Sequence, residues 1–147
     1  ANLLSGIADA YYDSVPVIFI TGQLNTYEYL DVKDIKQHGF QEMNVIDTVN
    51  SVVKYCEQVK NESDIRRILE QAWYTATEGR QGPVLIDLPM NIQRMEINPE
   101  ALIGFIPPKN NYELSDSKEV AAKIIEAIKE SQHPVFALGN GISKNDA

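Results

Sequence analysis

The densest group of residues that could do chemistry is the hexapeptide QHGFQE at residues 37–42. A carboxamide and an aromatic ring beside a glycine can shape a pocket for a small substrate. Helix capping is the alternative, because Glu42 would be favourable near the positive end of a following helix. The hexapeptide overlaps the end of a long polar stretch, residues 24–39, that we expect to form a loop beyond a strand. Such loops line the ligand crevice of open parallel sheets, although a surface insertion that contacts nothing fits the pattern equally well.

The other reactive side chains do not complete an active site. Cys56, the one cysteine, cannot form an internal disulfide, and we expect it to be a small buried apolar residue rather than a nucleophile. His38 and His133 show no metal-ligand spacing, and His133 is expected at a helix end. Residues 139–141, GNG, contain only two glycines of a dinucleotide fingerprint and equally suit a plain strand-to-helix turn.

Apolar periodicity predicts the elements that position these residues. Residues 2–12 form an amphipathic helix, and the wholly apolar run 17–20 predicts a buried strand directly after it. The expected apolar face of this helix consists of Leu3, Leu4, Ile7, Ala8 and Tyr11. A helix followed by a buried strand is a unit of a parallel sheet that normally follows an earlier strand, so we expect the sequence to be part of a longer protein.

The middle of the chain continues the same alternation. Residues 45–49 suit a short helix and residues 52–59 a strand, and a second buried strand spans residues 84–88. Between these strands lies the best-defined helix, which Asn61 or Ser63 would cap and Gly79 would end. Its expected apolar face consists of Ile65, Ile68, Leu69, Ala72, Trp73 and Ala76.

The last third predicts a linker and a second domain. Residues 94–115 are rich in proline and lack periodicity, which is typical of a linker. A helix capped by Ser115 or Ser117 follows, and then a third buried strand at residues 135–138. We expect the apolar side chains of this helix to face inward, namely Val120, Ala121, Ile124, Ile125 and Ile128. The sequence thus predicts an incomplete α/β domain, a parallel sheet with helices on both faces, followed by the start of a second, Rossmann-like α/β domain.

Composition excludes several function classes. The formal net charge of -8, with scattered basic residues, argues against nucleic-acid binding. No stretch is apolar enough to span a bilayer, and the first residues do not resemble a secretory signal. We therefore expect a cytoplasmic protein that binds neither membrane nor nucleic acid.

Four stretches, in this order, resemble the thiamine-diphosphate-dependent enzymes of the acetolactate synthase family, of the catalytic large-subunit type. These are ANLLSGIADAYYDSVPVIFITGQ, GFQE, AWYTATEGRQGPVLIDLPMNIQ and HPVFALGNGI. The resemblance implies that residues 1–93 are the C-terminal part of the pyrimidine-binding domain, 94–115 an interdomain linker, and 116–147 the first part of the central domain. The family's catalytic glutamate and its Gly-Asp-Gly magnesium motif are not in this sequence, so we expect the piece alone to be inactive.

The resemblance also implies roles for individual residues. Phe40 and Gln41 match a Phe-Gln pair that faces the active site, and we assign them as candidate catalytic residues. Asn2 matches the asparagine of the turn that opens the helix, and Gln23 matches a glutamine near the subunit interface. Both are candidate cofactor-binding residues. The implied cofactors are thiamine diphosphate and Mg²⁺, and the resemblance allows FAD in the central domain.

The implied reaction is decarboxylation of a 2-oxo acid such as pyruvate and transfer of the two-carbon unit to a carbonyl acceptor, in a homodimer or homotetramer. One departure concerns the loop of residues 24–39, which is longer than expected, with Gln37-His38-Gly39 in place of the usual Thr-Asp-Ala. The acceptor is therefore open, and a carboligase that uses a sugar or another ketone remains an alternative. A non-catalytic α/β binding module is the alternative from a different class.

Overall fold

The structure is a computed structural model that describes residues 2–28, 37, 39, 42–109, 115–137 and 139, without the side chains of residues 115 and 116. The chain divides into two compact units, residues 1–107 and 108–147. The assignment of these units to a pyrimidine-binding and a central domain remains a prediction.

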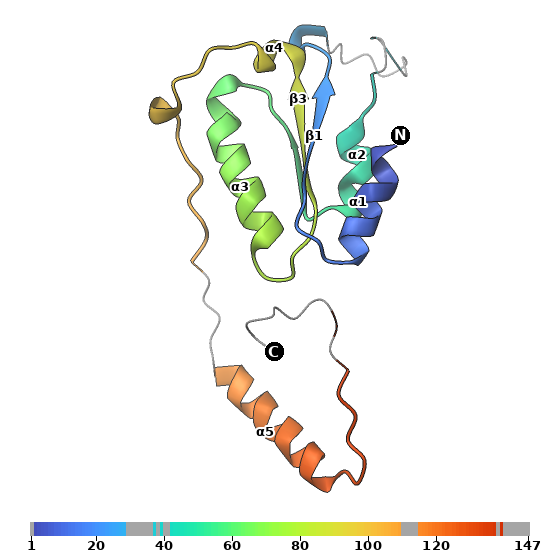
Figure 1. Ribbon diagram of the computed structural model, residues 1–147. Coiled ribbons are helices and arrows are strands. Elements are labelled where there is room, and N and C mark those ends of the chain that lie inside the picture. The colour runs from blue at the N-terminus through green and yellow to red at the C-terminus, as the bar shows by residue number, and fades with distance from the viewer. Residues whose placement is uncertain are drawn as a thin grey trace. The chain divides into compact units, whose positions relative to one another are not determined.

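A parallel three-stranded sheet forms the centre of the first unit. Its strands are β1 (Ile18–Gln23), β2 (Tyr55–Gln58) and β3 (Val84–Pro89), in the order β1-β3-β2. Both outer strands run parallel to β3, so the carboxyl ends of all three lie at one edge (Figure 1). This arrangement confirms the expected α/β class.

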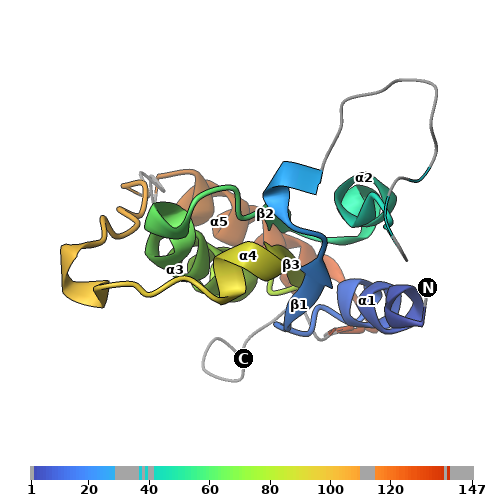
Figure 2. The same cartoon turned by 90° about the horizontal axis from the view of Figure 1, so that it is seen from above.

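Helices cover both faces of the sheet. Helix α3 (Ile65–Thr77) lies on one face, and α1 (Leu3–Tyr12) and α2 (Val45–Val49) lie on the other (Figures 1 and 2). The short α4 (Met90–Gln93) follows β3 at the carboxyl edge. Single 3-10 turns span Thr26–Glu28, Asn50–Val52, Glu62–Asp64 and Pro99–Ala101.

Two apolar clusters hold these layers together, because alternate side chains of β3 point to opposite faces. Val84 and Ile86 pack with Ile68 beneath α3, whereas Leu85 packs with Ile7 of α1. Each of these side chains is at most 1% exposed. Residues 99–105 lie along α3, where Arg66 Nη1 donates to the carbonyls of Pro99 and Leu102.

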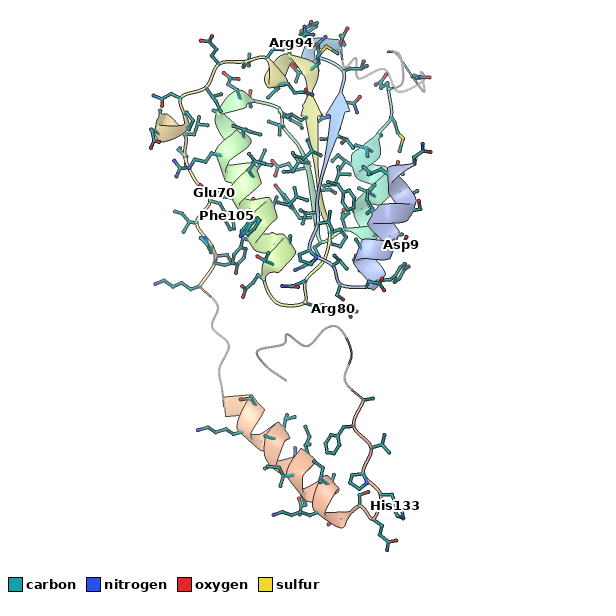
Figure 3. The ribbon with its side chains drawn as sticks, viewed as in Figure 1. Asp9, Glu70, Arg80, Arg94, Phe105 and His133 are labelled. Atoms are coloured by element: carbon teal, nitrogen blue, oxygen red, sulfur yellow. The ribbon has the colours of Figure 1, made fainter. Side chains whose placement is uncertain are left out.

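Figure 3 labels a further contact between this segment and α3. The backbone N–H of Phe105 donates to Glu70 Oε2 at 2.7 Å, and the Phe105 ring lies 5.5 Å from that of Tyr74. Residues 94–107 of the expected linker therefore belong to the first unit by their contacts.

Several expectations for the first unit are wrong in detail. β1 is not wholly buried, since Ile20 is 59% exposed on an outer strand of the described sheet. Trp73 lies on the predicted apolar face of α3 yet is 66% exposed, because the helix buries a narrower stripe through Ile68, Ala72 and Ala76. The N-cap of α3 is Asp64, without a side-chain cap hydrogen bond. Gly79 does follow α3 with a φ of 60°, which confirms the predicted stop.

The second unit contains α5 (Ser115–Glu130), as predicted. The third buried strand is wrong: residues 135–137 form no strand, Val135 is 91% exposed, and Leu138 lies outside the described residues. A strand needs a hydrogen-bonded neighbour, and the described part of this unit supplies none. The inward face of α5 is also wrong, because Val120, Ile124 and Ile125 are each more than half exposed. His133 follows the end of α5 and is exposed.

Among the described residues, no helix is long and apolar enough to cross a membrane.

Candidate functional site

A cleft of about 630 Å³ opens at the carboxyl edge of the sheet. Its walls come from the end of β1 at Gln23, from residues 42–47 before and within α2, and from the end of β2. A second cavity of about 160 Å³ lies against α1 and shares four lining residues with the cleft, namely Gln23, Met43, Val45 and Asp87. Both cavities therefore lie where parallel sheets bind ligands.

Asp87 connects all three strands at this edge. Only 1% of its surface is exposed. Its Oδ1 accepts a hydrogen bond from Thr21 Oγ1 at 2.8 Å, and its Oδ2 accepts from Gln58 Nε2 at 2.8 Å and from Gln23 Nε2 at 3.3 Å. A buried carboxylate without such donors would be costly, so these bonds explain how the central strand tolerates an acid.

Strand register accounts for this convergence. Thr21 lies opposite Asp87 on one side, and Gln58 lies opposite Asp87 on the other. Partners in a parallel register place their side chains on the same face, and Gln23, two residues beyond Thr21, shares it. The run VLIDLP therefore places Asp87 directly between hydrogen-bond donors on the two neighbouring strands.

Among the described residues, the charges that line the cleft are mostly negative. The acidic ones are Glu42, Asp47, Glu57, Asp64 and Asp87, and the basic one is Lys60. A cleft of this sign favours neutral or cationic hydrogen-bond donors over phosphate.

Glu57 belongs to a local network on β2. Arg67 Nη2 donates to Glu57 Oε1 at 2.7 Å, and the Tyr55 hydroxyl donates to Glu57 Oε2. Burial alone would raise the pKa of Glu57, but the bonds from Arg67 and Tyr55 outweigh it and hold the pKa below its usual value. Burial, with the bond to Glu57, raises the pKa of Tyr55. Glu57 is therefore an anion at the cleft wall.

Cys56 also lines the cleft, and its environment favours the thiol. Burial, followed by the negative charge of Asp47, raises the pKa of Cys56. A thiol nucleophile needs the opposite shift. The structure therefore supports the interpretation of Cys56 as a packing residue.

The structure describes two of the four predicted site residues, and one of these two lies in the cleft. Gln23 lines both cavities. Asn2 is exposed, its carbonyl accepts from Ser5 Oγ at 3.4 Å, and it is not among the residues that line either cavity, although its neighbour Leu3 is. Phe40 and Gln41 lie outside the described residues, and their roles stay predictions.

The residues on either side of Phe40 and Gln41 are described. Gly39 N donates to Glu42 Oε2 at 3.0 Å, and Glu42 N donates to Gly39 O at 3.3 Å. The helix-capping alternative for Glu42 is wrong, because Asn44 caps α2 and its side chain accepts from Asp47 N at 3.1 Å. Glu42 instead bonds to Gly39 through both its backbone N–H and its side chain.

Sequence reasoning missed Thr21, Gln58 and Asp87. The signal for Asp87 was available, because a single acid inside an apolar strand must find buried donors. Its partners depend on strand order and register, which local patterns do not contain.

Hydrogen-bonding groups line the cleft beside an apolar wall. Carboxylates and carboxamides lie next to the side chains of Met43, Val45 and Ile46. A few polar groups beside an apolar surface are typical of small-molecule pockets. The described residues contain no cluster of three or more His, Cys, Asp or Glu side chains that could hold a metal ion.

Comparison with known proteins gives the chain's relatives. No protein-family model matches it. The chain is 35% identical over 150 residues to the chloroplastic acetolactate synthase of Arabidopsis thaliana, and 37% identical over 142 residues to acetolactate synthase 3 of Brassica napus. It is 32% identical over 142 residues to the acetolactate synthase large subunit of Lactococcus lactis. These matches cover 95%, 95% and 97% of the chain but only 20%, 21% and 24% of the relatives. The chain thus spans between a fifth and a quarter of the relatives' length, and it belongs to the acetolactate synthase family.

Proposed function

We propose that the chain is part of a thiamine-diphosphate-dependent enzyme that decarboxylates a 2-oxo acid such as pyruvate and transfers the two-carbon unit to a carbonyl acceptor. The observation that carries this proposal is the 32–37% identity to acetolactate synthases over at least 95% of the chain. The cleft at the carboxyl edge of the sheet supports it, because this is where such a sheet would bind a cofactor.

The cleft would hold only part of the cofactor. Its acceptors and apolar wall fit the aminopyrimidine ring of thiamine diphosphate, whereas the diphosphate and Mg²⁺ require residues other than those described here. When bound, the cofactor supplies the carbanion chemistry, and the protein supplies binding and orientation. Residues 1–93 would form the C-terminal part of the pyrimidine-binding domain, and residues 116–147 the start of the central domain, where FAD would bind if the enzyme carries it.

The predicted site residues take distinct roles in this proposal. Phe40 and Gln41 face the substrate, and Asn2 and Gln23 belong to the cofactor's surroundings. We expect the complete enzyme to be a cytoplasmic homodimer or homotetramer.

The test begins with the full-length protein that contains this chain. Isothermal titration with thiamine diphosphate and Mg²⁺ should show saturable binding, and pyruvate should release carbon dioxide. Activity assays with pyruvate and a series of 2-oxo acid, aldose and ketone acceptors would then show which acceptor receives the two-carbon unit. A folded full-length protein that binds no cofactor would refute the enzyme and favour the non-catalytic binding module.

Two variants test the predicted pair. Gln41→Ala and Phe40→Ala should each lower kcat/KM for pyruvate about tenfold or more, because misplaced substrate loses much of its rate acceleration. Gln81→Ala is the matched control, since Gln81 is exposed and precedes β3 at the opposite edge of the sheet, near the labelled Arg80 (Figure 3). Equal effects of Gln41→Ala and Gln81→Ala would remove Gln41 from the site.

A further inference from the structure

The side-chain amide of Gln23 makes three hydrogen bonds that use both of its N–H groups. Its Oε1 accepts from Leu24 N at 3.1 Å. Its Nε2 donates to the carbonyl of Met43 at 2.9 Å and to Asp87 Oδ2 at 3.3 Å. A primary amide has two N–H donors, so Gln23 has none left for a ligand.

These partners lie at the two ends of one segment. Leu24 begins the stretch that leaves β1, and Met43 ends the return that leads into α2. One side chain therefore joins the departing backbone, the returning backbone and the buried acid of the central strand.

A second contact, between Gly39 and Leu24, also brings the two ends of this segment together. A Cβ at Gly39 would lie 2.1 Å from Leu24 Cδ1 and 3.0 Å from Leu24 Cγ. No real Cβ tolerates such a distance, so the approach of the returning chain to Leu24 requires a glycine unless the leucine side chain moves.

The end of the segment that follows β1 makes a further contact, with Asn91. Thr26 N donates to Asn91 Oδ1, and Asn91 Nδ2 donates to Thr26 Oγ1, both at 2.9 Å. Asn91 belongs to α4, which follows β3. Both Asp87 and Asn91 thus tie the segment to β3 or to the helix directly after it.

We infer that Gln23 is a positioning residue that clasps the base of the 24–43 segment, with Gly39 against Leu24 as the second part of the clasp. This inference rests on the proposed function, in which that segment carries the substrate-facing Phe40 and Gln41. Gln23 acts through the backbone it holds and does not bind the cofactor with its amide N–H groups.

The test uses the full-length protein and the variant Gln23→Met, which keeps the side-chain length and removes all three amide bonds. Trypsin cleavage after Lys33 and Lys36, which lie in sequence between the two clasped ends, is followed by mass spectrometry. Cleavage of a transiently open form tracks its population, so loss of these bonds should speed cleavage about tenfold. Thr21→Val is the matched control, because it removes a bond to the same Asp87 without touching either end, and cleavage should stay within about twofold.

Enzyme kinetics distinguish a positioning role for Gln23 from a role in cofactor binding. Gln23→Met should lower kcat/KM for the 2-oxo acid while the Kd for thiamine diphosphate stays within about twofold of the parent value. A weaker cofactor Kd with unchanged cleavage would show direct cofactor binding and overturn the clasp, as would equal cleavage of Gln23→Met and Thr21→Val. The cleavage assay needs no cofactor, so the clasp is tested even if the full-length protein proves inactive.

A second pair of variants does not depend on the folding of Gln23→Met. Gly39→Ala should speed the same cleavage, and adding Leu24→Ala should remove most of that effect, because the added methyl group then has room. Residues in contact show such non-additivity. Additive effects of Gly39→Ala and Leu24→Ala would mean that the two residues do not form one contact.

Discussion

Replacement of Asp87 tests whether the cleft depends on one saturated carboxylate. Asp87→Ala leaves three donors, those of Thr21, Gln23 and Gln58, without their acceptor. Hydrogen bonds to a charged group contribute about 1.5 kcal/mol each at the low end of their range, so we expect the loss of all three to lower the free energy of unfolding by about 4–5 kcal/mol.

Asp87→Asn should be much milder. The Thr21 hydroxyl can reverse its role and accept from the new Nδ2, while the remaining oxygen accepts from Gln23 and Gln58. The three hydrogen bonds remain but are no longer strengthened by a charge, which lowers the free energy of unfolding by about 1–2 kcal/mol. Part of this loss is offset because the variant no longer buries a charge.

Hydrogen–deuterium exchange of the peptide that contains β3 measures this difference locally in the full-length protein. Asp87→Ala should speed its exchange about a thousandfold and Asp87→Asn about tenfold, since each 1.4 kcal/mol is a factor of ten. Glu96→Ala, at an exposed acid outside the sheet, should change nothing measurable. Equal effects of Asp87→Ala and Asp87→Asn would refute the argument that the hydrogen bonds to residue 87, rather than its charge, stabilise the carboxyl edge of the sheet.

Three further predictions follow from the first unit. Ile68→Ala, at a side chain 1% exposed between α3 and the sheet, should lower the free energy of unfolding by about 3–4 kcal/mol in urea denaturation, whereas Ile106→Ala, 87% exposed, should cost less than about 0.5 kcal/mol. Gly79→Ala should lower the same quantity by about 1 kcal/mol, because the φ of 60° at this position disfavours a Cβ; an unchanged urea midpoint would contradict the predicted helix stop. Because the folded pKa of Glu57 lies below its usual 4.5, its contribution is present above that pH and is lost as the pH falls through the lower folded value. The stability difference between the parent and Glu57→Gln should therefore shrink on acidification, and a difference independent of pH would show that the Arg67 bond does not depend on the charge of Glu57.

The elements of this protein were predictable where local pattern and burial agree. The run at residues 84–88 is apolar apart from Asp87 and is followed by a proline, and it is the central strand, buried on both faces. The helix before it was expected from its periodic apolar residues and from Gly79. Prediction failed for Ile20, Trp73 and Val135, because apolar character fixes a preference for burial and not the presence of a covering neighbour.

The candidate site was predictable only in part. Gln23 was identified through its place after a strand in a stretch that resembles a known family, and the structure places it at the cleft. Its bonds to Met43 and Asp87 join residues 20 and 64 positions away in the sequence. No local pattern contains such a separation, so Gln23 was assigned to the cofactor rather than to the backbone it holds.

The sequence by itself determined the type and order of the strands and main helices of the first unit and, through resemblance, the family, because helix and strand periods and turn residues act over a few positions. Tertiary structure alone decided that β3 lies between β1 and β2, and this order brings Thr21 and Gln58 to either side of Asp87. The physical reason is that a buried acid is stable only where donors from separate strands meet it, and strand order and register decide where that is.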